Sequence, residues 1–169
     1  MEPVHTFGIV AFKQSDTLQA VLSDICDWAV QSGASVLFHP CLRECLSGEA
    51  DVAPSEEMLL EQSQMLLSIG GDGTFLSTLH MCKFVPKPVI GLNLGGLGFL
   101  TDIGVDVLRE SLDRLHRGDY TTIQRMVLET DVFSGGRKTH HFHALNDVFV
   151  NRCGTPKLAP VDAWYGDDF

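Results

Sequence analysis

The sequence lacks the patterns that would direct a chain into a membrane or out of the cell. No apolar run reaches membrane-spanning length, because polar residues or glycines interrupt every long stretch. The N-terminus has no basic start followed by an apolar stretch, so it carries no visible secretory signal. We therefore expect, by default, a cytoplasmic protein that does not associate with membranes.

Basic residues are also scarce. The 22 acidic residues outnumber the 12 lysines and arginines, and the formal net charge is −10. This charge argues against a protein that coats nucleic acid, because such proteins need a positive field over the phosphates. It is compatible with a small anionic ligand held by backbone N–H groups, a metal ion and a few local basic side chains.

Paired cysteines and complete metal-binding motifs are missing. An odd number of cysteines and no signal peptide indicate free thiols, and no second pair completes a zinc site with Cys41 and Cys45. His140, His141 and His143 resemble a metal cluster, but His140 takes the opposite strand face and no partner cysteine or acid is evident. We therefore predict no metal site there. The five cysteines are Cys26, Cys41, Cys45, Cys82 and Cys153.

What the sequence does have is an alternation of strand and helix patterns over residues 1–118. Short apolar runs predict strands, and apolar residues at three-to-four spacing predict helices between them. This order is typical of an α/β domain with a Rossmann-like parallel sheet, whose binding site lies at the carboxyl ends of the strands. The expected strands are 7–12, 34–38, 65–69 and 88–92, and the expected helices start after Ser15, at Thr74 and at Val105.

The pattern changes after Gly118. Residues 121–133 and 138–150 are rich in β-branched and aromatic residues, and 134–137 joins them as a hairpin turn would. Residues 157–165 resemble a third strand. We interpret 119–169 as the start of a second, all-β domain, and we expect the sequence to be shorter than its natural length because so few strands make a poor fold.

The chemistry concentrates in residues 70–74, Gly-Gly-Asp-Gly-Thr, between a predicted strand and a predicted helix. Glycine lets a ligand approach the backbone, and a helix start offers N–H groups that suit phosphate oxygens. A carboxylate in such a cradle does not help phosphate binding. Asp72 makes sense if it accepts a proton from an attacking hydroxyl or orients magnesium, as phosphoryl transfer requires. The alternative is a glycine-rich turn with a helix-capping aspartate.

Three segments together resemble the NAD kinase family. Gly-Gly-Asp-Gly-Thr is shared with lipid kinases of the diacylglycerol and sphingosine type and, more loosely, with phosphofructokinases. The second glycine-rich loop, residues 91–102, resembles the NAD kinase segment and not the lipid kinase one. Residues 144–148, Ala-Leu-Asn-Asp-Val, are similar to a motif on a strand of the family's β domain. The resemblance spans essentially the whole chain.

The resemblance implies a phosphotransferase that moves a phosphoryl group from ATP or polyphosphate, with Mg²⁺, to the adenosine 2′-hydroxyl of NAD. Asp72 would be the general base toward that hydroxyl. Gly71, Gly73 and Thr74 would shape the phosphate site. The family's dimers or tetramers, which form through the β domain, imply a homodimer or homotetramer.

Five further positions would contact NAD or support its site. Phe99 would pack near the adenine, and Asn93 would stiffen the second loop. Asn146 and Asp147 would hydrogen-bond ribose hydroxyls, since an amide and a carboxylate suit a diol. Lys157 matches a basic or polar NAD contact by spacing alone.

Each of these positions also has an ordinary structural interpretation. Asn93 could only form the loop, and Phe99 could belong to the core. Asn146 and Asp147 could end a strand or form a turn.

Two other functions stay open. One is a lipid kinase of the diacylglycerol type, against which the second loop argues. The other is a nucleotide-binding module without catalysis, because the family's later Asp-Gly segment and its Thr/Ser/Gly-rich loop do not occur in these residues. We therefore expect this piece alone to lack activity.

Overall fold

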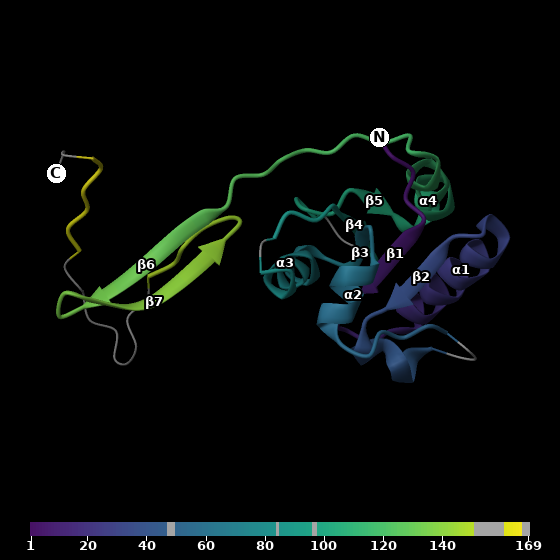
Figure 1. Cartoon of the computed structure of the whole chain (residues 1–169), viewed down its shortest axis with the longest axis horizontal. Helices are drawn as coiled ribbons and strands as arrows, with labels where there is room; N and C mark the ends of the chain where they lie inside the picture. Colours follow the sequence, from purple (N-terminus) through teal and green to yellow (C-terminus); the bar gives the residue numbers. More distant parts are fainter. Residues whose placement is uncertain (47–49, 84, 96–97, 151–160, 167–169) are drawn as a thin grey trace. The chain divides into compact units, whose positions relative to one another are not determined.

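The computed structural model describes residues 1–46, 50–83, 85–95, 98–150 and 161–166 (Figure 1). The chain divides into two compact units, Met1–Gln124 and Arg125–Phe169. The sequence places the division at 118/119, near the end of the last helix of the first unit. The segment that follows that helix stays tied to this unit, since the Tyr120 hydroxyl donates to the Glu2 carbonyl at 3.1 Å.

The first unit is built on a parallel sheet of five strands in the order β2-β1-β3-β4-β5. The first four strands confirm the predicted ones to within two residues at each end. The short β5 was not predicted, because two residues carry no readable pattern. The strands are β1 (Thr6–Val10), β2 (Ser35–Phe38), β3 (Met65–Gly70), β4 (Val89–Asn93) and β5 (Ile103–Gly104).

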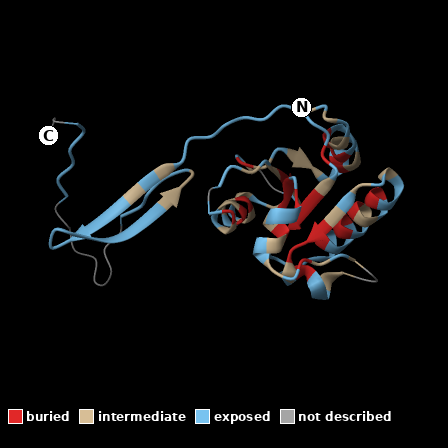
Figure 2. Cartoon of the chain, in the orientation of Figure 1, coloured by how far each residue is buried: buried red, intermediate tan, exposed pale blue. Residues whose placement is uncertain are grey.

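Helices cover both faces of this sheet, and Figure 2 shows the buried residues along the strands and the inward helix faces. One side of the core joins the strands to α1 and α4, and the other joins them to α2 and α3. Neighbouring strand residues serve opposite sides, as the two-residue period requires: Leu67 faces the first and Leu66 the second. The helices are α1 (Asp16–Ser32), α2 (Glu56–Gln62), α3 (Asp72–Met81) and α4 (Leu108–Arg117), with 3₁₀ turns η1 (Pro40–Cys45) and η2 (Val105–Val107).

Helix α1 confirms its predicted ends. The Ser15 hydroxyl accepts a hydrogen bond from the Leu18 N–H at 3.1 Å, which satisfies one free donor of the first turn. Gly33 ends the helix in the left-handed conformation, with φ of 74°. The predicted apolar face is also the buried one: Leu18, Val21, Leu22, Ile25, Trp28 and Ala29.

Helix α3 begins earlier than the sequence pattern indicates. We expected it to open at Thr74, but Asp72 is its first residue and Gly71 its N-cap. Two glycines beside an aspartate have weak helix propensity, so the first turn is invisible to sequence analysis. The consequence is that Asp72 lies on the helix itself.

The second unit contains a hairpin of β6 (Leu128–Ser134) and β7 (Arg137–Ala144). Gly135 and Gly136 form its turn with φ of 56° and 75°, the two positive values that a tight hairpin turn needs. The hairpin was predicted, but its strands are shorter than 121–133 and 138–150. Of the third predicted strand, residues 157–160 lie outside the described part, and 161–164 belong to no strand.

Two further expectations concern cysteines and membranes. Cys26, Cys41, Cys45 and Cys82 are free thiols, as predicted, and Cys153 lies outside the described residues. Among the described residues, no helix combines the length and the apolar character that crossing a membrane would take.

Gly91 of β4 tests how closely the second loop packs on the sheet. A Cβ at Gly91 would lie 2.8 Å from the Thr101 Cα and 3.1 Å from the Phe75 ring. We expect Gly91→Ala to lower the free energy of unfolding by about 1–3 kcal/mol, because the backbone must shift. Gly73→Ala is the matched control. Open space surrounds Gly73, so alanine should leave the stability unchanged or raise it by up to about 1 kcal/mol. Denaturant unfolding measures both, and equal effects would contradict this packing.

Candidate active site

Two adjacent parallel strands bring the two glycine-rich loops to the same edge of the sheet. β3 ends at Gly70 and β4 at Asn93, and these two residues are partners in the strand register. The chain leaves Gly70 into α3 and leaves Asn93 into the second loop. The predicted meeting of the loops is thereby confirmed, and hydrogen bonds join them.

Asp72 makes those hydrogen bonds. Its Oδ2 accepts from the Phe99 N–H at 3.0 Å, and its Oδ1 accepts from the Leu100 N–H at 2.9 Å. The N-cap of α3 is Gly71, which has no side-chain cap bond. The interpretation of Asp72 as a helix-capping aspartate is therefore wrong, because its carboxylate reaches across to the second loop.

These hydrogen bonds favour the ionised form of Asp72. The N–H of Phe99, followed by that of Leu100, stabilises the ionised form and lowers the pKa of the carboxyl below its ordinary value. The position at the first residue of α3 acts in the same direction, since a helix N-terminus favours negative charge. Asp72 is thus an ionised hydrogen-bond acceptor. The two hydrogen bonds fix the position of its carboxylate and make it a weaker base.

The second loop is braced from within. The Asn93 Oδ1 accepts from the Gly95 N–H at 3.0 Å, and its Nδ2 donates to the Thr101 hydroxyl at 3.2 Å. Gly98 packs against the same hydrogen-bonded residues: a Cβ there would be 2.3 Å from the Thr101 Oγ1 and 3.0 Å from the Asp72 Oδ1. Sequence analysis missed Thr101 as a supporting residue, because a threonine eight positions from Asn93 gives no local pattern.

An open hollow of about 580 Å³ lies beside these hydrogen-bonded residues. It contains two carboxylates, Asp102 and Asp106, which sequence analysis did not single out. Their grouping depends on the turn into β5, which the sequence does not reveal. The lining residues are Asn93, Leu94, Gly95, Gly98 and Thr101 to Asp106.

The structure places the remaining predicted residues as follows. Gly71 and Gly73 leave open space at the start of α3. Phe99 is 85 % exposed, so the interpretation of this side chain as core is wrong. Thr74 lies in the first turns of α3, next to this edge.

Three predicted residues belong to the second unit. Asn146 and Asp147 are exposed and follow β7, which ends at Ala144, so their expected place on a strand is wrong. The hydrogen bonding of β7 stops before them, and a bend replaces it. Lys157 lies outside the described residues. The ligand contacts of all three stay predictions.

Known proteins share the sequence pattern and the fold of this chain. Residues 7–120 match the family described as the ATP-NAD kinase N-terminal domain. The NAD kinase of Heliobacterium modesticaldum is 39% identical over 118 residues, which cover 69% of this chain and 42% of that protein. The NAD kinase of Thiobacillus denitrificans is 30% identical over 169 residues, 99% of this chain and 58% of that protein.

A third relative also covers most of this chain. The NAD kinase of Caldanaerobacter subterraneus subsp. tengcongensis is 28% identical over 162 residues, 96% of this chain and 57% of that protein. The chain thus spans a little over half the length of such relatives. A crystal structure of yeast NADH kinase complexed with NADH shares the fold, with a TM-score of 0.70 at 19% identity, over 86% of this chain and 48% of that one.

Removal of the Asp72 carboxylate tests the tether between the loops. In Asp72→Ala the amides of Phe99 and Leu100 lose their acceptor, and we expect their hydrogen exchange to accelerate about tenfold or more, as the loss of a charge-assisted hydrogen bond implies. Residue-resolved exchange by NMR measures this. Asp102→Ala, in the same loop, is the control and should leave both amides protected. Unchanged exchange in Asp72→Ala would show that the tether does not order the loop.

The same tether predicts a pH dependence. Because the pKa of Asp72 is lowered in the folded protein, its stabilising contribution is present above the ordinary aspartate value of about 3.9 and is lost only as the pH falls through the lower folded value. The amide shifts of Phe99 and Leu100 should therefore titrate with a midpoint below about 3.9. In Asp72→Asn this titration should vanish. A midpoint above 3.9 would contradict the hydrogen bonding described.

Proposed function

The chain belongs to the NAD kinase family, and on that premise we propose that the protein transfers a phosphoryl group to the adenosine 2′-hydroxyl of NAD, which forms NADP. The observation that carries the proposal is the position of Asp72. An ionised carboxylate stands at the start of α3, held there by the N–H groups of Phe99 and Leu100. A negative carboxylate does not help to bind phosphate. It is useful at a phosphate site if it accepts the proton of a hydroxyl that attacks a phosphoryl group.

The start of α3 would hold the phosphates of the donor. The first N–H groups of a helix have no partner within the helix, and the helix dipole adds a partial positive charge. Gly71 and Gly73 leave this backbone open, since no heavy atom lies within 4 Å of the position that a Cβ would take. Thr74 would complete this cradle from the same turn.

Asp72 would then act on the acceptor. The 2′-hydroxyl oxygen forms a bond to phosphorus, its proton passes to an Asp72 oxygen, and the bond from phosphorus to the leaving oxygen of the donor breaks. A carboxylate with a lowered pKa is a weak base, so it takes the proton late, when the hydroxyl oxygen has already transferred charge to phosphorus. The hydrogen bonds from the Phe99 and Leu100 N–H groups would keep this proton acceptor in place.

A magnesium ion that accompanies the donor would find carboxylate ligands beside this site. The hollow beside Asp72 is lined by the Asp102 and Asp106 carboxylates, which are the oxygen ligands that Mg²⁺ takes. When bound, the ion would neutralise phosphate charge. Asp102 and Asp106 would hold it near the phosphates, which leaves Asp72 to the hydroxyl.

The finer parts of the proposal come from the family resemblance. They are the choice of ATP or polyphosphate as donor, a cytoplasmic location, and assembly into homodimers or homotetramers. They also include contacts of Phe99 with adenine, of Asn146 and Asp147 with ribose, and of Lys157 with NAD. Asn93 would support the NAD site through its hydrogen bonds within the second loop.

The experiment is NADP formation from NAD and Mg²⁺-ATP, measured with an NADP-specific dehydrogenase. We expect Asp72→Asn to lower kcat by about 10²–10⁴-fold, the usual contribution of a positioned proton acceptor, with a much smaller change in NAD affinity. Asp119→Asn is the matched control. That aspartate is exposed, and its Oδ2 lies 3.1 Å from the Arg114 Nε. Neither residue belongs to the two glycine-rich loops, so replacement of Asp119 should leave kcat unchanged.

Other outcomes point to other functions. Phosphorylation of diacylglycerol but not of NAD would make the protein a lipid kinase. Binding of NAD without turnover would indicate a nucleotide-binding module. Full activity in Asp72→Asn would refute the proton-acceptor role while leaving the kinase activity in place.

A further inference from the structure

The polar face of the β6–β7 hairpin gathers acids and histidines from both strands. In the strand register Glu129 is the partner of His143, and Asp131 is the partner of His141. Since strand side chains alternate between faces, these four residues share one face. The sequence suggested that no acid accompanies the histidines, but the pairing of β6 with β7 brings Glu129 and Asp131 beside them.

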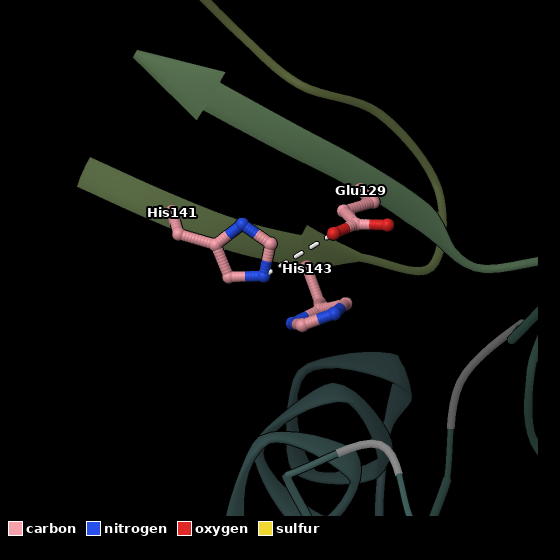
Figure 3. A group of neighbouring side chains, drawn as sticks. All are labelled: Glu129, His141 and His143. Atoms are coloured by element: carbon pink, nitrogen blue, oxygen red, sulfur yellow. Dashed lines mark ion pairs between the residues drawn. The ribbon is translucent and has the colours of Figure 1, made fainter. Parts of the chain in front are cut away.

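Three of these side chains converge (Figure 3). Each of Glu129, His141 and His143 offers one ligand atom, and these atoms all lie within 4.8 Å of one another. The Glu129 Oε1 is 3.5 Å from the His141 Nε2, and the two imidazole rings stand edge to face with centroids 4.8 Å apart. His140 stands apart from this cluster and stacks on Phe142.

Asp131 orients His141. Its Oδ1 is 2.6 Å from the His141 Nδ1, so Nδ1–H donates to the carboxylate. The other ring nitrogen, Nε2, faces the Glu129 Oε1 at 3.5 Å. Lys138 also contacts this Oδ1, at 2.6 Å, and balances the charge of Asp131. Two electron-pair donors, Nε2 and Oε1, therefore face each other, and such an arrangement needs a cation between them. That cation is either a proton on His141 or a metal ion.

We propose that Glu129, His141 and His143 bind a divalent transition metal ion of the Zn²⁺ class. Two imidazoles and one carboxylate form a ligand set that zinc uses when a fourth position is left to water, and the carboxylate on the far nitrogen of His141 is the support that metal-bound histidines receive. Bonds of about 2.1 Å place tetrahedral ligand atoms about 3.4 Å apart, so side-chain rotations on this accessible face close the site.

The bound ion would link the two strands and so stabilise the hairpin. Two-stranded hairpins are marginally stable by themselves, and this one joins its strands by a metal bridge from β6 to β7. The site uses none of the residues assigned to catalysis. It therefore stands or falls independently of the kinase function.

The test is calorimetric titration of the whole chain with Zn²⁺ in a buffer that does not chelate metals. We expect an equivalent of Zn²⁺ whose affinity falls at least tenfold in His141→Ala, in His143→Ala and in Glu129→Gln. His140→Ala is the matched control. Its zinc affinity should stay within about twofold of that of the unchanged protein, because His140 lies on the opposite face of β7 and supplies no ligand. Thiols that bind zinc do so equally in all four variants and cancel in the comparison.

The NMR spectrum of the unmodified protein keeps the test independent of variant folding. Zn²⁺ should shift the ring resonances of His141 and His143 and leave those of His140 and His116 in place. If the ring resonances of His141 and His143 do not move, or if His140→Ala and His141→Ala lose zinc equally, the proposal is overturned. The contacts between Glu129 and His141 are then an ordinary ion pair bridged by a proton.

Discussion

The site depends on one constraint, the parallel pairing of β3 with β4. Because Gly70 and Asn93 are partners at the ends of these strands, the two glycine-rich loops begin side by side. The Asp72 carboxylate then spans the gap to the N–H groups of Phe99 and Leu100. Without that pairing the loops would be unrelated turns, and the Asp72 carboxylate would lack the two N–H groups that lower its pKa.

The same hydrogen-bond network explains why two positions of β4 and the second loop have no room for a side chain. Gly91 and Gly98 are small because Thr101 and the Asp72 oxygen occupy the space of a side chain. Asn93 joins the start of the loop to Thr101 near its end. The Asp72 carboxylate, held by backbone amides rather than by charged side chains, has a lowered pKa and a defined position. Both would suit the proposed phosphoryl transfer, which depends more on the placement of groups than on their basicity.

The hairpin illustrates a different principle. Its histidines are adjacent in the sequence, but the acids that complete the cluster come from the other strand, and only the register of β6 with β7 reveals them. The same register separates His140 from the cluster by the alternation of strand faces. A metal bridge on the polar face and catalysis by the α/β unit would then be separate properties of one chain.

The sequence by itself determined the α/β class, the caps of α1, the hairpin and the two loops, because hydrophobic periodicity, Ser15, Gly33 and paired turn glycines are local signals. It did not determine the start of α3 at Asp72, where two glycines hide the first turn, or the two-residue β5. Tertiary structure alone decided that Asp72 binds the second loop instead of capping its helix, that Phe99 is exposed, and that Glu129 meets His141. Each of these depends on residues far apart in the chain, and a local pattern carries no information about which distant backbone group or side chain will arrive within hydrogen-bonding distance.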